Sequence, residues 1–171
     1  MSETKVIGID LGATNIRAGL VHEGNIHTIQ SKRIKSAGTV EEVLADFYLL
    51  IDTLLDNEVV AIGIGVPSVV DLAKGIVYDV QHIPSWKEVP LKEILEKKYK
   101  LPVYVNNDAN CFALGEFHFG KGRGKSDMIG LSIGTGLGGG AIVNKHLFAG
   151  SNCGAGEFGM VDYLDHNYEY Y

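Results

Sequence analysis

The chain has 171 residues, of which 46% are hydrophobic, and it carries a formal net charge of −6 at pH 7. This length allows one domain, or one domain and part of a second. The acidic balance argues against a polyanion such as DNA, so we expect no nucleic-acid partner. No signal-peptide pattern opens the chain and no apolar run reaches about 18 residues, so we expect no membrane span and a cytoplasmic protein.

The first part of the chain predicts four strands and one long helix. Each strand is a short apolar run bounded by turn residues, and the first two form a hairpin. Thr39-Val-Glu-Glu42 fits a capping box, and apolar residues recur behind it at helical spacing to about Asp56. A fully apolar strand after this helix predicts parallel pairing inside an α/β layer fold. The predicted strands are residues 5–11, 15–22, 26–34 and 59–66.

The middle of the chain is less regular. Residues 71–90 are predicted to be irregular, and a short helix with a proline in its first turn follows them. Residues 102–105 predict another short strand. A further helix begins at Asn107 or Asp108 and runs to a glycine that suits a C-terminal cap.

The segment 120–126 holds three glycines and no apolar side chain, which makes it the best linker candidate. We therefore predict a domain of residues 1–120 and the beginning of a second domain, residues 121–171. That second module stops without a closing element, so we expect the chain to be truncated. The same segment carries the main basic cluster, which we interpret as a solvated loop: Lys121, Arg123 and Lys125.

Two stretches of the chain follow one template, an apolar run, a glycine-rich turn and a second apolar run. They begin at Val6 and Met128, and Gly12 aligns with Gly134. A repeat of this length indicates two related modules rather than a solenoid. Two such turns facing each other could hold the phosphates of a nucleotide between two domains.

The first turn carries side chains that suit phosphate and magnesium. Gly12 lets the backbone approach an anion, and Thr14 and Asn15 can donate hydrogen bonds to phosphate oxygens. Asp10 could hold Mg²⁺ through water, because this ion takes few carboxylates together with phosphate oxygens. An ordinary tight hairpin would explain the same residues.

The second turn, Gly134-Thr135-Gly136, opens a run that formally matches a dinucleotide-binding fingerprint. That fingerprint requires a helix directly after the glycines. Residues 141–148 instead predict a strand, a turn and a strand. We therefore expect a second phosphate-binding turn and no Rossmann site.

Two carboxylates are candidates for contact with a second substrate. Asp108 follows a short strand and opens a helix, where the helix dipole favours the ionised form. Such a carboxylate can accept the proton of a hydroxyl that attacks phosphorus, a reaction in which positioning carries most of the catalysis. A plain helix cap is the other explanation. Glu157, which lies between glycines, could bind sugar hydroxyls or belong to a surface loop.

Taken together, these motifs resemble those of the ROK family (repressor, open reading frame, kinase), which includes bacterial glucokinases and related sugar kinases. The resemblance covers most of the chain, from Ile7 to about Glu157. It implies an α/β fold of the actin-like ATPase (ribonuclease H-like) type, with the start of a second, incomplete domain of the same kind. The matching segments are residues 10–15, 63–71, 107–110, 134–140 and 156–159.

The resemblance also implies a reaction and its residues. It implies ATP-dependent phosphorylation of a hexose hydroxyl, with ATP and Mg²⁺ bound. Glucose is the first candidate for the hexose. The alternative is a non-catalytic sugar-binding or regulatory member of the family. In the kinase, Asp108 is the catalytic base, and the expected sugar contacts are Asn107, Asp108, Glu157 and His82. The expected phosphate and Mg²⁺ contacts are Asp10, Gly12, Thr14, Asn15, Gly134, Thr135 and Gly136.

Some positions depart from the family pattern. Met160 stands where the family has a histidine that touches sugar and joins a cysteine-rich zinc site, and its thioether is a poor zinc ligand. Cys111 and Cys153 form no Cys-x-x-Cys pair, so we expect no zinc. Ser68 replaces a glycine, and His82 stands where a sugar-contacting asparagine is common, although a plain loop histidine would explain it equally well. We expect the chain by itself to lack turnover and to pair as a homodimer through exposed apolar surface.

Overall fold

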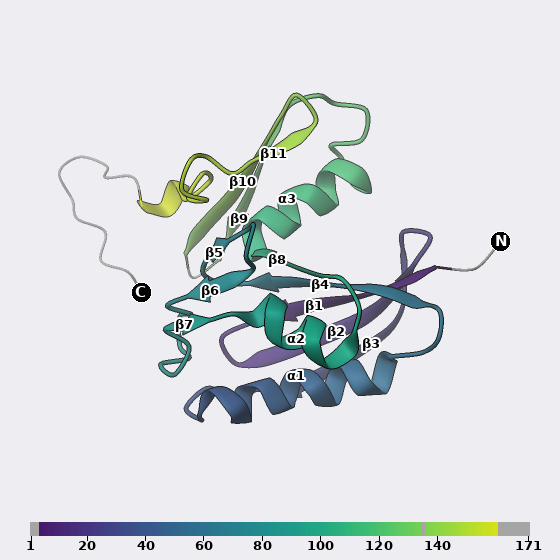
Figure 1. Ribbon diagram of the computed structural model, residues 1–171. Coiled ribbons are helices and arrows are strands. Elements are labelled where there is room, and N and C mark those ends of the chain that lie inside the picture. The colour runs from purple at the N-terminus through teal and green to yellow at the C-terminus, as the bar shows by residue number, and fades with distance from the viewer. Residues whose placement is uncertain (1–3, 135, 161–171) are drawn as a thin grey trace. The chain divides into compact units, whose positions relative to one another are not determined.

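The computed structural model describes residues 4–134 and 136–160, which form two compact units (Figure 1). The first unit ends at Asp108 and the second begins at Ala109. The predicted boundary after Gly120 concerns the domains of the whole protein and stays a prediction. Within the described residues, no helix is both long and apolar enough to cross a membrane.

The first unit is built on a five-stranded mixed sheet of order β3-β2-β1-β4-β8. β1, β2 and β3 pair antiparallel, whereas β1–β4 and β4–β8 pair parallel. The parallel pairing predicted for the fully apolar strand, β4, is confirmed. Strands of a parallel sheet are covered on both faces, so their sequences need no alternation of apolar and polar residues. The bounds are β1 (Lys5–Leu11), β2 (Asn15–His22), β3 (Asn25–Arg33), β4 (Val59–Val66) and β8 (Val103–Asn107).

A second, three-stranded sheet of order β5-β6-β7 belongs to the same unit. Its strands are β5 (Val69–Asp71), β6 (Ile76–Tyr78) and β7 (Glu88–Val89). The prediction that residues 71–90 are irregular is therefore wrong for β6 and β7. Strands of two or three residues are too short to show a period-two pattern, and pairing with sequence-distant partners decides them.

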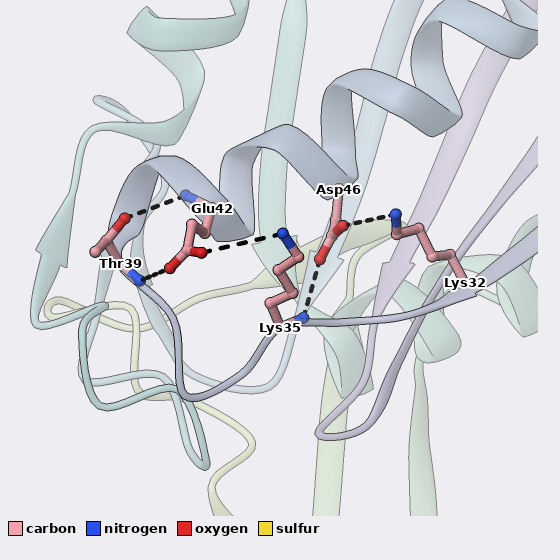
Figure 2. Close-up of polar contacts among 5 residues, drawn as sticks. All are labelled: Lys32, Lys35, Thr39, Glu42 and Asp46. Atoms are coloured by element: carbon pink, nitrogen blue, oxygen red, sulfur yellow. Dashed lines mark hydrogen bonds and ion pairs between the residues drawn. The ribbon is translucent and has the colours of Figure 1, made fainter.

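Two helices of the first unit bury apolar faces. In α1 (Val40–Leu54) the predicted capping box is present: the Thr39 hydroxyl accepts from the Glu42 N–H at 3.3 Å, and the Glu42 carboxylate accepts from the Thr39 N–H at 3.0 Å (Figure 2). Phe47 and Ile51 on this helix are fully buried. α2 (Leu91–Tyr99) follows Pro90, as predicted, and buries Leu91.

A buried carboxylate fixes the chain between β3 and α1. Asp46 is only 2% exposed, and one of its oxygens accepts from the Lys35 N–H at 2.9 Å (Figure 2). Its other oxygen lies 3.0 Å from the Lys32 ammonium group. The carboxylate therefore satisfies a partly buried backbone donor and has its own charge compensated, which a buried acid requires.

We expect Asp46→Ala to lower the free energy of unfolding by about 2–3 kcal/mol, because it leaves the Lys35 N–H without its acceptor and the Lys32 ammonium group without its counter-charge. Glu42→Ala removes only the exposed side-chain half of the capping box and should cost about 1 kcal/mol or less. Urea denaturation followed by circular dichroism measures both. Equal losses for the two variants would contradict the role given to Asp46.

The second unit packs α3 (Asp108–His118) against a three-stranded sheet of order β11-β10-β9. Glycines on the sheet make this close approach possible: a Cβ added at Gly140 would lie 2.7 Å from the Cβ of Ala113, and one at Gly130 would lie 3.0 Å from it. The sheet and the short helix after it comprise β9 (Met128–Ile133), β10 (Leu137–Val143), β11 (His146–Phe148) and η1 (Phe158–Met160).

Three apolar side chains at alternate positions of β9 are exposed, and Ser132 is exposed as well. Ile129 is 62% exposed, Leu131 49% and Ile133 82%, whereas Gly130 between them is buried against the helix. Because side chains alternate along a strand, these three lie on the face of the sheet opposite α3. That face forms a continuous apolar strip within the second unit.

Candidate functional site

The parallel strands of the first unit bring three motifs to one edge of the sheet. Asp10 at the end of β1 pairs with Gly65 of β4, and Gly65 pairs with Asn106 of β8. Asn107 ends β8, and Asp108 follows it directly. The phosphate turn after β1 and the candidate base therefore start from the same carboxyl edge, where ligands bind in open α/β sheets.

In the first turn, residues 12–15, some hydrogen-bond donors are used within the turn and others remain for an anion. The Gly12 N–H donates to the Asn15 carbonyl at 2.9 Å, so this N–H closes the turn and is not one of the donors left for an anion. Ala13 and Thr14 are exposed, and their N–H groups make no hydrogen bond to any other described residue. These two amides and the Thr14 hydroxyl remain as donors. Gly12 is needed for closure, since an added Cβ would lie 3.1 Å from the Asn15 oxygen.

Asp10 fits the magnesium role. Its side chain is exposed, and among the described residues it makes neither a hydrogen bond nor an ion pair. Arg17 is its partner on β2 in the strand ladder, but the two side chains form no ion pair. A single unpaired carboxylate beside a turn with free amide donors matches the preference of Mg²⁺ for few carboxylates, water and phosphate oxygens.

The second turn is shorter than the first. β9 and β10 pair from Ile133 to Leu137, with residues 134–136 between them, whereas four residues, 12–15, separate the paired ends Leu11 and Ile16. The two hairpins therefore share a template but not a register. The Gly134 N–H donates to the Gly136 carbonyl at 2.9 Å. Thr135 lies outside the described residues.

Packing explains only part of the glycine run that begins at Gly134. A Cβ added at Gly134 or Gly136 would meet nothing within 4 Å, whereas one at Gly139 would lie 2.5 Å from the Phe158 ring. Gly140 is packed against α3. The first two glycines are therefore free of packing constraints, as a turn that approaches an anion through its backbone would be. β10 begins at Leu137, so the strand predicted in place of a Rossmann helix is confirmed.

This division of the glycines can be measured. Gly140→Ala should destabilise the protein by about 1–3 kcal/mol, because the new methyl group overlaps Ala113. Gly134→Ala should change stability by less than about 0.5 kcal/mol, since the site is open, but should weaken nucleotide binding. Thermal unfolding and calorimetric titration with ATP give the two readouts. A destabilised Gly134→Ala variant, or a fully stable Gly140→Ala variant, would refute the division.

The predicted sugar contacts at the end of β8 are held by a neighbouring turn. The side-chain amide of Asn107 donates to the Ser68 carbonyl at 3.3 Å, and the Asn107 N–H donates to the Asn106 side chain at 2.8 Å. The first bond links β8 to the turn that follows β4. Asp108 is exposed at the first position of α3. The turn after β4 and the end of β8 are thus joined by a hydrogen bond between Asn107 and Ser68.

His82 lies at the tip of a loop that a buried tryptophan anchors. The Val80 N–H donates to the Trp86 carbonyl at 3.1 Å, and His82 takes a left-handed conformation with φ of 63°. Trp86 is fully buried and stacks on Phe47 of α1, with ring centroids 5.6 Å apart. The sequence reasoning missed this anchor, although the only tryptophan of the chain, set among turn residues, was the available signal.

Glu157 belongs to the second unit. It is half-buried and follows Gly156, whose φ of 97° favours glycine. Its contact with sugar beside Asp108 stays a prediction. In the part of the chain that is described, no three His, Cys, Asp or Glu side chains gather into a metal site. The side chain of Met160 lies outside the description, and the absence of zinc stays a prediction.

Comparison with known proteins gives the relatives of this chain. The ROK family profile matches residues 6–167. A glucokinase of Streptomyces coelicolor is 39% identical over 157 residues, which cover 91% of this chain and 49% of that protein. A xylose repressor of Caldicellulosiruptor bescii is 37% identical and is matched over 90% of this chain and 40% of its own length. The chain spans about half the length of the curated glucokinases it matches.

Solved structures agree. A ROK family glucokinase from Streptomyces griseus, in complex with glucose and AMPPNP, superposes with a TM-score of 0.81 at 37% identity, over 92% of this chain and 50% of that one. The Lmo2764 protein of Listeria monocytogenes, a putative N-acetylmannosamine kinase, gives 0.82 at 33% identity, over 92% and 54%. These neighbours have the actin-like ATPase fold, so the predicted fold class is confirmed.

Proposed function

Since the chain belongs to the ROK family, we propose that the protein is an ATP-dependent sugar kinase that transfers the terminal phosphoryl group of ATP to a hexose hydroxyl. The observation that carries this proposal is the row from Asp10 through Gly65 to Asn106, which gives a phosphate turn and an acid one common edge. Glucose is the first candidate, because several relatives are glucokinases. The need for ATP agrees with a cytoplasmic location.

Asp108 acts as the base in this proposal. The attacking hydroxyl oxygen forms a bond to phosphorus, its proton passes to the Asp108 carboxylate, and ADP leaves. The position of Asp108 at the start of α3 favours its ionised form, because the helix N-terminus carries partial positive charge. Asn107, fixed through its bond to the Ser68 carbonyl, together with Glu157 and His82, orients the sugar.

The two glycine turns bind the phosphates. The Ala13 and Thr14 amides, the Thr14 hydroxyl and the Asn15 side chain donate to phosphate oxygens from the first turn, and Gly134, Thr135 and Gly136 approach from the second. Asp10 would hold Mg²⁺ through water. When bound, this ion neutralises charge on the phosphates, and prepositioned donors supply the remaining stabilisation of the transition state.

A regulatory sugar-binding protein is the second candidate. Xylose repressors are among the relatives, at 37% identity for the one from Caldicellulosiruptor bescii. Met160 in place of the family histidine favours this reading, whereas Asp108 and both glycine turns favour the kinase. Release of ADP by the complete gene product, measured over a panel of hexoses, separates the two candidates.

Asp108→Asn in the complete gene product should lower kcat by roughly 10²–10⁴, the range for a positioned acid–base group. The affinity for sugar should change far less, since the amide keeps the shape of the side chain. Glu93→Gln on the exposed surface of α2 removes the same charge and serves as the control. Near-normal kcat in Asp108→Asn would remove this residue from the role.

We further propose a homodimer that pairs through residues 127–171, where Ile129, Leu131 and Ile133 form an exposed apolar strip. Such a strip favours association. Light scattering of the 171-residue chain should give a mass above that of the monomer, and Ile129→Thr with Ile133→Thr should reduce it. Ile29→Thr on β3, which is 65% exposed, is the control. A strictly monomeric chain at high concentration contradicts the proposal.

A further inference from the structure

The proposed kinase uses none of the basic residues of the second unit, yet these residues are not scattered. Every Lys and Arg that follows Asn110 lies in one of two turns, the turn between α3 and β9 and the turn between β10 and β11. In a chain of net charge −6, this is a local excess of positive charge. The residues are Lys121, Arg123, Lys125 and Lys145.

Backbone contacts hold the two turns together. The Lys145 N–H donates to the Ser126 carbonyl at 2.7 Å, and the Asn144 N–H donates to the Asp127 carboxylate at 2.8 Å. Gly122 is buried, and a Cβ there would lie 2.7 Å from the Cα of Phe117 in α3. These contacts hold the backbone of the two turns close together, so the basic residues that the turns carry are brought to one place.

These turns surround an open hollow of about 290 Å³, lined by Phe117, His118, Arg123, Gly124, Lys125 and Lys145. Arg123, Lys125 and Lys145 make no ion pair with any residue that the structure describes. Three like charges around one hollow repel one another unless an anion lies between them. The volume lies just below the usual range of pockets that enclose a drug-sized ligand, so the hollow can take only a small one.

Two carboxylates near these turns, Glu116 and Asp127, accept hydrogen bonds from the turns themselves. Glu116 accepts from the Lys121 N–H at 3.1 Å. Asp127 accepts from the Ser126 hydroxyl and the Asn144 N–H, and these bonds hold the pKa of the Asp127 carboxyl below its ordinary value. Both acids thus stabilise the turns, and among the described residues neither forms an ion pair with Arg123, Lys125 or Lys145.

We propose that this hollow binds a multiply charged phosphate anion, either a free phosphate chain such as tripolyphosphate or the triphosphate of a nucleotide. Arg binds phosphate oxygens through two parallel N–H groups, and Lys binds them as a point charge. A nucleic acid would need a longer basic surface and would meet the repulsion of an acidic protein. The proposal does not depend on the kinase assignment.

The hollow is separate from the second glycine turn, which belongs to the same unit. It lies where β9 begins and β10 ends, whereas residues 134–136 join the opposite ends of the same two strands. A strand of this length spans roughly 17 Å. One triphosphate therefore cannot occupy both places.

Calorimetric titration of the protein with tripolyphosphate at fixed ionic strength tests the site. We expect saturable binding that Lys125→Gln with Lys145→Gln weakens about tenfold, as expected for lost charge-assisted contacts. Lys97→Gln with Lys100→Gln removes the same charge from exposed positions of the first unit, away from the basic turns, and should change affinity less than about twofold. Arg123→Gln is a second variant of the hollow, should the first one fold poorly.

Further arms identify the source of the anion and the location of binding. If ATP binds more tightly than tripolyphosphate with the same dependence on Lys125 and Lys145, the ligand is a nucleotide. Equal affinities indicate a free phosphate chain. Equal weakening in the hollow and control variants, loss of binding only in Thr14→Val, or no binding above that of inorganic phosphate would each overturn the proposal.

Discussion

The parallel, in-register pairing of β1, β4 and β8 is the constraint on which the candidate site depends. Parallel strands end at the same edge, so residues from three distant parts of the chain, Asp10, Gly65 and Asn106, stand in one row. The segment that follows each strand therefore begins at that edge. A shift of one residue in the β1–β4 pairing would turn the Asp10 side chain to the other face of the sheet, and the same shift in the β4–β8 pairing would turn that of Asn106.

Glycine plays two physical roles in the second unit. Gly130 and Gly140 allow α3 to approach the sheet, because a methyl group at either position would press on Ala113. Gly134 and Gly136 have open space around them, so their small size serves the backbone of the turn rather than the core. A single glycine-rich run thus joins a packing surface to a candidate phosphate turn.

The two units differ in whether their charged side chains have partners of opposite charge among the described residues. In the first, the buried carboxylate of Asp46 has both oxygens occupied, one by the Lys35 N–H and one by the Lys32 ammonium group. Its desolvation is thereby offset, and it ties a connecting segment to α1. In the second, Arg123, Lys125 and Lys145 line a hollow and form no ion pair within the described part of the chain. The compensated charge of Asp46 stabilises the fold, whereas the basic charges around the hollow are the ones that we propose bind an anion.

The sequence by itself determined the elements whose signal is local. The capping box of Thr39 and Glu42, the helix behind it, the strand hairpins and the start of α3 at Asp108 all follow from residues within a few positions of one another. The candidate site residues were also named from sequence, through motifs of the same short range. These features were predictable because capping bonds and side-chain periodicity act between near neighbours in the chain.

Only the tertiary structure decided the features that join distant residues. It created β6 and β7 in a segment that looked irregular, made the second turn shorter than the first, and committed the Gly12 N–H to closing its own turn. It also buried Trp86 against Phe47 and gathered the basic turns around one hollow. Strand register and side-chain packing arise between segments far apart in the chain, and no local pattern encodes which segments will meet.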